Sequence, residues 1–189
     1  PFYYSDVKVD PSNPDHLYTL SGGLSKSTDG GKTFLSIAQG QHGDNQALWI
    51  DPKNSNRVLS GDDGGFRVSY DGFKTFDAIN NVELSQFYQL WVDERDPYYL
   101  YGGLQDNGTW TGPSNSLHQI GIMKRDWIQV AGGDGYYAVP VPGKENEVFA
   151  NLQGGVIFHV DTKTGNTRTI HPYPNKIGSA GDGMEFHKY

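Results

Sequence analysis

The stretch Ser27-Thr28-Asp29-Gly30-Gly31-Lys32-Thr33-Phe34 returns 42 residues later as Ser69-Tyr70-Asp71-Gly72-Phe73-Lys74-Thr75-Phe76. A fixed period of about forty residues indicates a repeat architecture. Each copy has the chemistry of a β-hairpin: a strand end, a tight Asp-Gly turn and a strand start that carries an aromatic residue. We therefore expect structural roles within this turn pattern for Ser27, Asp29, Gly31, Thr33, Phe34, Ser69, Asp71, Thr75 and Phe76.

An alternating apolar run also repeats, ahead of each copy and twice more beyond the second copy. Its equivalent positions are separated by 41, 42 and 47 residues, and an insertion around 111–124 lengthens the last step; these positions are Val9, Ile50, Val92 and Val139. Each step has room for four strands, because strands average about five or six residues and hairpin loops two to five. The sequence predicts an all-β fold of about four four-stranded antiparallel sheets, each a blade of a β-propeller. The expected blades are 1–41, 42–83, 84–134 and 135–175, followed by a tail at 176–189.

The composition supports a turn-rich β protein and excludes several other classes. The chain has 25 Gly, 12 Tyr, 9 Phe and 4 Trp residues and keeps no helical apolar period, so almost no helix is expected. Its mean hydropathy is −0.61 and it has no long apolar run, which predicts no membrane span. A net charge of −7 with scattered basic residues predicts no nucleic-acid partner, because phosphate backbones are bound by clustered Lys and Arg.

The turn pattern Ser-x-Asp-x-Gly-x-Thr-aromatic resembles the Asp-box, or bacterial neuraminidase repeat, of sialidases, sortilin-type receptors, photosystem assembly factors and xyloglucan-degrading glycoside hydrolases. The first copy fits at every position, whereas Phe73 replaces the usual Gly in the second. The phrases at 42–52, 102–108 and 132–135 are similar to those of exported bacterial sortilin-like and glycosyl-hydrolase-like repeat proteins. The resemblance covers about residues 1–175 and implies a propeller fold.

The same resemblance implies a secreted, periplasmic or cell-surface bacterial protein. Members of this family carry more blades than 189 residues hold, so we expect the chain to be a segment of a larger propeller. The alternative is that four blades close by themselves, since propellers of four blades exist. Its open ends would expose sheet faces that the remaining blades or another chain must cover. Asp-boxes occur in propellers of many functions, so the resemblance implies a fold rather than an activity.

Loop positions indicate where a ligand would bind. In an up-and-down sheet with strands A to D, the loop leading into A and the loop between B and C share one edge, here called the rim. The Asp-box is the C–D turn at the opposite edge. Carboxylates and amides beside aromatic rings suit a glycan, because hydroxyls need donors and acceptors while the apolar face of a pyranose stacks on a ring. The expected ligand-binding residues on the rim are Asp44, Asn45, Gln86, Gln105, Asp106, Asn107, Trp110, Asp134 and Tyr136.

An enzymatic role would require a pair of rim carboxylates. A glycosidase needs two carboxyl groups about 5–5.5 Å or about 6.5–9.5 Å apart. Rim neighbours come from different blades, so sequence spacing cannot select the pair, and Asp is also a common turn former. Sialidase activity is disfavoured, because the five arginines are scattered rather than clustered. The candidate catalytic residues are Asp44, Asp62, Asp63, Asp106 and Asp134.

No cofactor or metal site is expected, with calcium kept as the open alternative. The loops at 61–65 and 105–108 offer oxygen ligands that suit calcium, but neither has the loop pattern of an EF-hand. The six histidines show no paired spacing, so zinc is not expected.

The aromatic residues divide into expected core and expected surface. Trp110 and Tyr136 flank Asp-Asn-Gly and Asp-Gly loop tips, so we expect them to be exposed. The aromatic residues expected in the core are Phe34, Phe76, Trp49, Trp91 and Trp127.

Three functions follow from these patterns. The favoured one is a binding module of an exported bacterial protein that holds a glycan or peptide on the rim. One alternative is a glycoside hydrolase of the xyloglucanase type that uses paired carboxylates. The other is a scaffold or assembly subunit of a larger complex, in which other chains cover the exposed blade faces.

Overall fold

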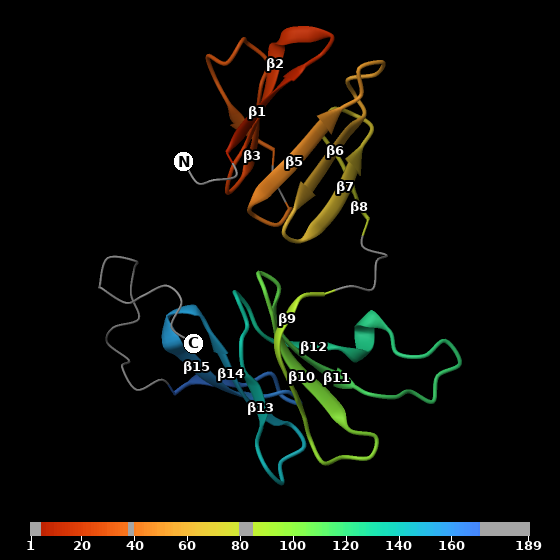
Figure 1. Ribbon diagram of the computed structural model, residues 1–189, viewed down its shortest axis with the longest axis vertical. Coiled ribbons are helices and arrows are strands. Elements are labelled where there is room, and N and C mark those ends of the chain that lie inside the picture. The colour runs from red at the N-terminus through yellow and green to blue at the C-terminus, as the bar shows by residue number, and fades with distance from the viewer. Residues whose placement is uncertain (1–4, 38–39, 80–84, 171–189) are drawn as a thin grey trace. The chain divides into compact units, whose positions relative to one another are not determined.

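A computed structural model describes residues 5–37, 40–79 and 85–170 (Figure 1). These residues form four four-stranded antiparallel sheets. Their helices are two 3-10 turns of three residues, η1 (Lys124–Asp126) and η2 (Gln153–Gly155), so no described helix could cross a membrane. The predictions of an all-β fold with almost no helix are confirmed. The predicted tail at 176–189 lies outside the described residues.

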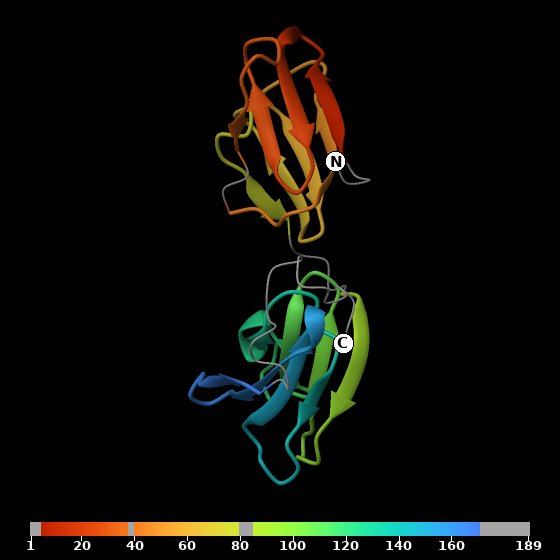
Figure 2. The ribbon, with the colours of Figure 1, turned by 90° about the vertical axis from the view of Figure 1, so that its left-hand side faces the viewer.

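In every sheet the four strands are neighbours in chain order, so each sheet is an up-and-down blade with strands A to D. Sheet 1 contains β1 (Asp6–Asp10), β2 (Asn13–Leu20), β3 (Leu24–Ser27) and β4 (Leu35–Ser36). Sheet 2 contains β5 (Asn45–Ile50), β6 (Val58–Asp62), β7 (Gly65–Ser69) and β8 (Asp77–Ile79). Figure 2 shows sheets 1 and 2 face to face.

The second half of the chain repeats this arrangement. Sheet 3 contains β9 (Phe87–Val92), β10 (Tyr99–Leu104), β11 (Gly108–Pro113) and β12 (Ile128–Ala131). Sheet 4 contains β13 (Ala138–Pro140), β14 (Glu147–Leu152), β15 (Val156–Asp161) and β16 (Thr167–Thr169). Four such sheets are the blades of a β-propeller module.

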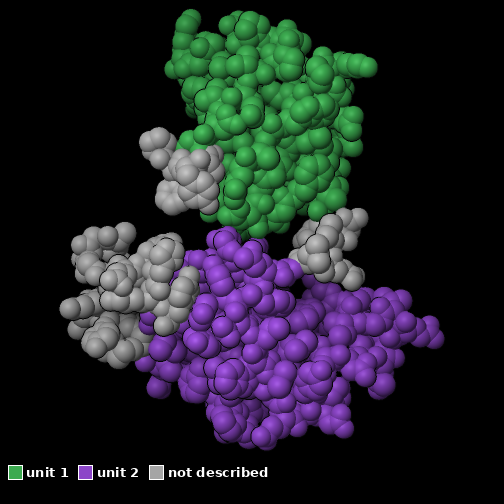
Figure 3. Space-filling model, in the orientation of Figure 1, with its two compact units in different colours: residues 1–83 green, residues 84–189 purple. Residues whose placement is uncertain are grey.

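The chain divides into two compact units, residues 1–83 and 84–189 (Figure 3). Each unit has its own core between its two sheets. The unit 1 core contains the buried residues Tyr18, Leu20, Leu24, Leu48, Ile50, Val58 and Phe73. The unit 2 core contains the buried residues Tyr101, Val130, Ala138, Val148, Ala150 and Val160.

The first copy of the repeated turn pattern, residues 27–34, closes the turn between β3 and β4 through a single carboxylate. Asp29 Oδ1 accepts hydrogen bonds from Ser27 Oγ at 2.8 Å and from the backbone N–H of Thr33 at 2.9 Å. Asp29 Oδ2 accepts the Thr33 hydroxyl at 2.6 Å. The Thr33 hydroxyl bond, followed by its N–H bond, lowers the pKa of Asp29 to about 2. The carboxylate therefore stays ionised and satisfies several turn donors together.

The second copy of the turn pattern, residues 69–76, keeps this geometry, although Phe73 stands where the first copy has Gly31. Asp71 accepts the backbone N–H of Thr75 at 2.9 Å and its hydroxyl at 2.7 Å. Phe73 has a φ of 69°, a left-handed conformation that is unusual for a bulky residue. Its side chain is only 3% exposed and its ring centroid lies 6.0 Å from that of Phe76. Core packing therefore holds a backbone conformation that Gly supplies without strain in the first copy.

Sheets 3 and 4 close their C–D connections in other ways. In sheet 3 the predicted insertion forms the connection itself, residues 114–127, which includes η1. In sheet 4, Asp161 Oδ1 accepts the backbone N–H groups of Lys163 at 2.9 Å and Thr164 at 3.1 Å. In this turn, as in the turns of Asp29 and Asp71, one carboxylate accepts the N–H groups of residues that follow it, but at a shorter spacing.

Several aromatic residues are more exposed than the sequence suggested. Phe76 packs against the unit 1 core as expected. Phe34, Trp49 and Trp91 are 42%, 45% and 50% exposed, so the expectation that they are buried is wrong. Trp49 is exposed because side chains alternate along a strand and the core of unit 1 takes its neighbour Ile50. Trp127 is half-buried.

Replacing Asp71 with Asn should change the acid sensitivity of unit 1. The backbone N–H of Thr75, followed by its hydroxyl, lowers the pKa of Asp71 to about 2 from 3.8. A depressed carboxylate pKa contributes stability above the unfolded-state value, and that contribution is lost as the pH falls toward 2. We expect Asp71→Asn to lower the Tm at pH 7 and to reduce the further fall in Tm between pH 4 and pH 2, measured by circular dichroism.

Lys74→Gln is the matched control, because the Lys74 backbone N–H still donates to Asp71 Oδ1 at 3.0 Å in that variant. It should retain the acid slope of the unsubstituted protein. An equal slope in Asp71→Asn and the unsubstituted protein would contradict the role assigned to this carboxylate.

Candidate functional site

Unit 2 brings together seven of the nine rim residues that the sequence suggested. The unit 2 rim is formed by the loop before β9, the β10–β11 loop, the loop before β13 and the β14–β15 loop. Asp44 and Asn45 belong to the rim of unit 1 instead. The seven residues in unit 2 are Gln86, Gln105, Asp106, Asn107, Trp110, Asp134 and Tyr136.

Hydrogen bonds tie the loops of the unit 2 rim to one another. The backbone N–H of Gln105 donates to Gln86 O at 3.1 Å, within sheet 3. Between the sheets, the N–H of Asp106 donates to Asp134 Oδ1 at 2.6 Å. The N–H of Asp134 in turn donates to Gln153 Oε1 at 2.9 Å. The rim is thus a connected surface rather than four separate loop tips.

Asp134 is a structural part of this network. Its side chain is held between the loops of sheets 3 and 4, and the residue is only 7% exposed. Its Oδ1 atom accepts the N–H of Asp106, and this hydrogen bond positions the β10–β11 loop. Asp134 therefore orients Asp106 and Asn107, which are its exposed or half-buried neighbours on the rim.

Aromatic side chains flank the polar loops of the unit 2 rim. The indole N–H of Trp110 donates to Asn107 O at 2.7 Å, which holds the half-buried indole against the β10–β11 loop. Tyr136 lies beside Tyr88, with ring centroids 5.4 Å apart, and beside Tyr137, with centroids 4.8 Å apart. Rings and amides therefore occur on the same small surface, as glycan or peptide binding requires.

In unit 1, the rim places two carboxylates close together. The loop before β5 carries Asp44, which has a φ of 55°, and the β6–β7 loop carries Asp63. The two side chains have carboxylate oxygens within 4.8 Å of each other. Gln46 donates an amide hydrogen bond to Asp63, and the N–H of Asn45 donates to Ser21 O at 2.8 Å. The latter bond joins the rim loops of sheets 1 and 2.

Two other candidates from the rim of unit 1 are buried. Asp62 forms an ion pair with Arg67, and the side chains of these residues are 0% and 9% exposed. Asn45 is 0% exposed, and its side-chain amide has no protein partner. Asp62 and Asn45 face the core side of sheet 2, so their side chains do not reach solvent at the rim.

The Asp44–Asp63 pair also bears on the calcium alternative. Calcium takes six to eight oxygen ligands, and short carboxylate spacings favour a cation. These two carboxylates supply only part of such a set within unit 1. They therefore do not by themselves define a calcium site.

Sequence reasoning missed three residues that shape the candidate site. Arg67 opposes Ser60 across β6 and β7, and only the strand register places it beside Asp62. Tyr88 and Gln153 were both within rim loops or next to them, but no pattern distinguished them from their neighbours. Their roles depend on contacts between sheets 3 and 4, which the repeat period alone does not specify.

Comparison with known proteins adds little to this geometry. No protein-family model and no curated protein matches the chain. Similar solved structures include an ancestral GH74 enzyme (14% identity, TM-score 0.37, 87% of this chain and 25% of that chain). Others are YCF48 bound to D1 peptide (12%, 0.34, 84% and 51%) and the nidogen/laminin complex (9%, 0.30, 85% and 77%). All three TM-scores are below 0.5, so the β-propeller assignment rests on the four sheets themselves.

Gly135 should be intolerant of a side chain because sheets 3 and 4 meet there. A Cβ at Gly135 would lie 2.1 Å from Thr109 Oγ1 and 2.6 Å from Gly108 O, whereas a Cβ at Gly132 would meet nothing within 4 Å. We expect Gly135→Ala to destabilise unit 2 by about 1–3 kcal/mol through overpacking. Gly132→Ala, in the same loop, should change stability by less than about 0.5 kcal/mol.

The measurement is urea unfolding followed by tryptophan fluorescence, since Trp91, Trp110 and Trp127 all lie in unit 2. Equal destabilisation by the two alanine variants would show that the close approach of the two sheets at Gly135 does not limit stability.

Proposed function

We propose that the chain is a binding module of an exported bacterial propeller protein and that it holds a glycan or peptide on its rim. The observation that carries this proposal is the unit 2 rim, where amides, a carboxylate and aromatic rings lie on hydrogen-bonded loops. The bond from Trp110 Nε1 to Asn107 O joins an aromatic ring directly to an amide-bearing loop.

The chemistry of this surface suits recognition of hydroxyl or amide groups. Asn107 is exposed, and Gln105 and Asp106 are half-buried beside it. Their side chains offer both donors and acceptors, while Trp110 and Tyr136 offer ring surface. Loops held by their neighbours lose less conformational entropy on binding, so the network favours affinity.

The state of the carboxylates favours binding without turnover. Asp62 is paired with Arg67, and Asp134 accepts the Asp106 N–H. Neither group is left to act as an acid, base or nucleophile on a solvent-borne ligand. In unit 2 this leaves Asp106 as the single rim candidate for catalysis, whereas glycoside hydrolysis uses two carboxylates.

A glycoside hydrolase of the xyloglucanase type is the second candidate, because Asp44 and Asp63 are close in unit 1. One carboxylate oxygen of each residue lies within 4.8 Å of the other, and retaining enzymes hold their two carboxyl groups about 5–5.5 Å apart. The amide of Gln46 donates a hydrogen bond to Asp63 and orients that carboxylate.

Exposed apolar strands support the proposed partner, namely further blades or another chain. In β1, Val7 and Val9 are 54% and 51% exposed, and in β9 Leu90 and Val92 are 55% and 50% exposed. These are strand A positions that alternate toward one face of their sheet. Covering them would remove apolar surface from water in the manner of a blade-to-blade contact.

Alanine substitution on the unit 2 rim tests the binding proposal. Trp110→Ala and Tyr136→Ala should each weaken the binding of a ligand found by glycan or peptide array, by roughly 2- to 13-fold if stacking contributes about 0.5–1.5 kcal/mol. Tyr70→Ala is the control, because Tyr70 is 65% exposed and belongs to the Asp-box turn rather than the rim. Calorimetry that finds no ligand, or equal loss in all three variants, would reject the site.

Hydrolysis assays separate the two candidate functions. A binding module should leave soluble xyloglucan oligosaccharides intact after prolonged incubation. If the polysaccharide is cut, and Asp63→Asn abolishes cleavage while the exposed control Asp77→Asn does not, the hydrolase assignment replaces the binding assignment. Chromatography of the products is the measurement.

A further inference from the structure

A cavity of about 150 Å³ opens between sheets 3 and 4 at the edge opposite to the rim. Residues from the A–B turn of sheet 3 and from the A–B and C–D turns of sheet 4 line it, so it lies entirely within unit 2. The charged residues among those that line this cavity are Arg95 and Lys163, and both are cationic. The lining residues used here are Arg95, Tyr99, Tyr101, Asn146, Thr162 and Lys163.

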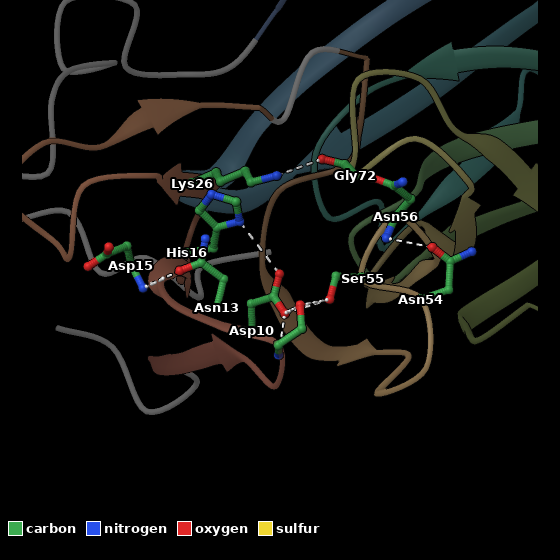
Figure 4. Close-up of polar contacts among 10 residues, drawn as sticks. Asp10, Asn13, Asp15, His16, Lys26, Asn54, Ser55, Asn56 and Gly72 are labelled. Carbon is green, nitrogen blue, oxygen red and sulfur yellow. Dashed lines mark hydrogen bonds and ion pairs between the residues drawn. The ribbon is translucent and has the colours of Figure 1, made fainter.

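At the corresponding edge of unit 1, two side-chain contacts bridge the sheets. In sheet 1 the buried Tyr18 pairs with Lys26, whose ammonium crosses to Gly72 O of sheet 2 at 3.2 Å (Figure 4). In sheet 3 the buried Tyr101 pairs with Thr111, which stands where Lys26 stands in sheet 1. The side chain of Thr111 is too short to reach sheet 4, so the presence of Thr in place of Lys leaves a cavity at this edge of unit 2.

A second hydrogen bond between the sheets of unit 1 is replaced in unit 2 by bonds within one sheet. Ser55 of sheet 2 donates to Asp10 Oδ1 of sheet 1 at 2.6 Å, which closes the edge between the two A–B turns (Figure 4). The equivalent carboxylate of sheet 3 is Asp93, at the end of strand A. It accepts the N–H of Tyr99 at 2.8 Å and the hydroxyl of Tyr101 at 3.0 Å, both within its own sheet.

Arg95 is held in place at the cavity with donors to spare. Its Nε donates to Asp93 Oδ2 at 2.5 Å and its NH2 donates to Tyr101 OH at 2.8 Å. The guanidinium carbon lies 3.6 Å from the centroid of the Tyr99 ring. An arginine has five N–H donors, and these contacts use two of them. The remaining donors belong to a side chain already fixed in one orientation, which lowers the cost of binding.

Sheet 4 contributes the other polar groups of the cavity. The N–H of Thr162 donates to Asn146 O at 2.7 Å, and its hydroxyl donates to the same oxygen at 3.1 Å. These bonds join the C–D turn to the A–B turn. Lys163 follows Thr162, and the side chains of Lys163 and Asn146 are both exposed at the mouth.

We propose that this cavity binds a small oxyanion, namely the carboxylate, sulfate or phosphate group of a larger ligand. Arg supplies a rigid fork for two oxygens and Lys supplies a mobile positive charge, a pairing that suits such groups. The site lies at the opposite edge of the sheets from the rim and does not depend on the function proposed for the rim.

Titration of the whole protein with three probes tests the proposal. Inorganic phosphate, inorganic sulfate and glucuronate are each added against sodium chloride of the same ionic strength, and binding is followed by calorimetry and by ¹H–¹⁵N spectra. Saturable binding with shifts at Thr162 and Lys163 is expected for at least one probe. Glucuronate alone would identify a carboxylate ligand, and phosphate or sulfate alone a phosphorylated or sulfated one. No saturable binding of any probe would overturn the proposal.

Two variants at the mouth of the cavity locate the site. Lys163→Gln should weaken binding about tenfold by removing a charge-assisted contact, and Asn146→Asp should weaken it further by adding a negative charge. Lys32→Gln is the matched control, because Lys32 and Lys163 both follow an Asp in a C–D turn and both donate their N–H to it. Equal affinities in Lys163→Gln and Lys32→Gln would place the anion elsewhere and overturn the assignment.

Discussion

Both sheets of unit 1 depend on one interaction, a carboxylate that accepts several hydrogen bonds inside a tight turn. Asp29 and Asp71 each bind the N–H and hydroxyl of the Thr four residues later. This contact fixes the turn between strands C and D in sheets 1 and 2 and thereby the direction of the last strand of each of these sheets. Strand direction then decides which loops share the rim and which share the opposite edge. Every functional inference about the molecule follows from that separation of edges.

The same chemistry limits how the remaining acidic residues are interpreted. Asp10, Asp51 and Asp93 end strand A in three blades, and each accepts a backbone N–H two residues later. Such groups shape turns and need no ligand. A carboxylate becomes a functional candidate only where it lies outside this role. Asp44, Asp63 and Asp106 meet that condition on the rim, whereas Asp62 and Asp134 are committed to protein contacts.

The sequence alone predicted the sheets because both of its signals are local. Period and turn chemistry operate within about forty residues, so the hairpins and the two loop edges could be read directly. Contacts between sheets are not local in this sense. The bond from Asp106 to Asp134 requires sheets 3 and 4 to be in place. The Asp62–Arg67 pair lies within one hairpin, but it requires the register of β6 and β7, which the repeat pattern does not specify. The prediction that Trp49 is buried was wrong for a different reason: side chains alternate along β5, and Ile50 rather than Trp49 points into the core.

Sheets 1 and 3 repeat the same strands but differ in the side chains at one edge. Tyr18 and Tyr101 occupy equivalent buried positions, yet their cross-strand partners are Lys26 and Thr111. The long side chain of Lys26 reaches the next sheet at the edge of unit 1, whereas the short side chain of Thr111 lines a cavity in unit 2. Lys26 and Thr111 both fit strand C of their sheets, so the sheet can form with either residue. A substitution of this kind changes neither the repeat period nor the strands. It changes the side chains at one edge of the sheet, and so two repeated blades can offer different binding surfaces.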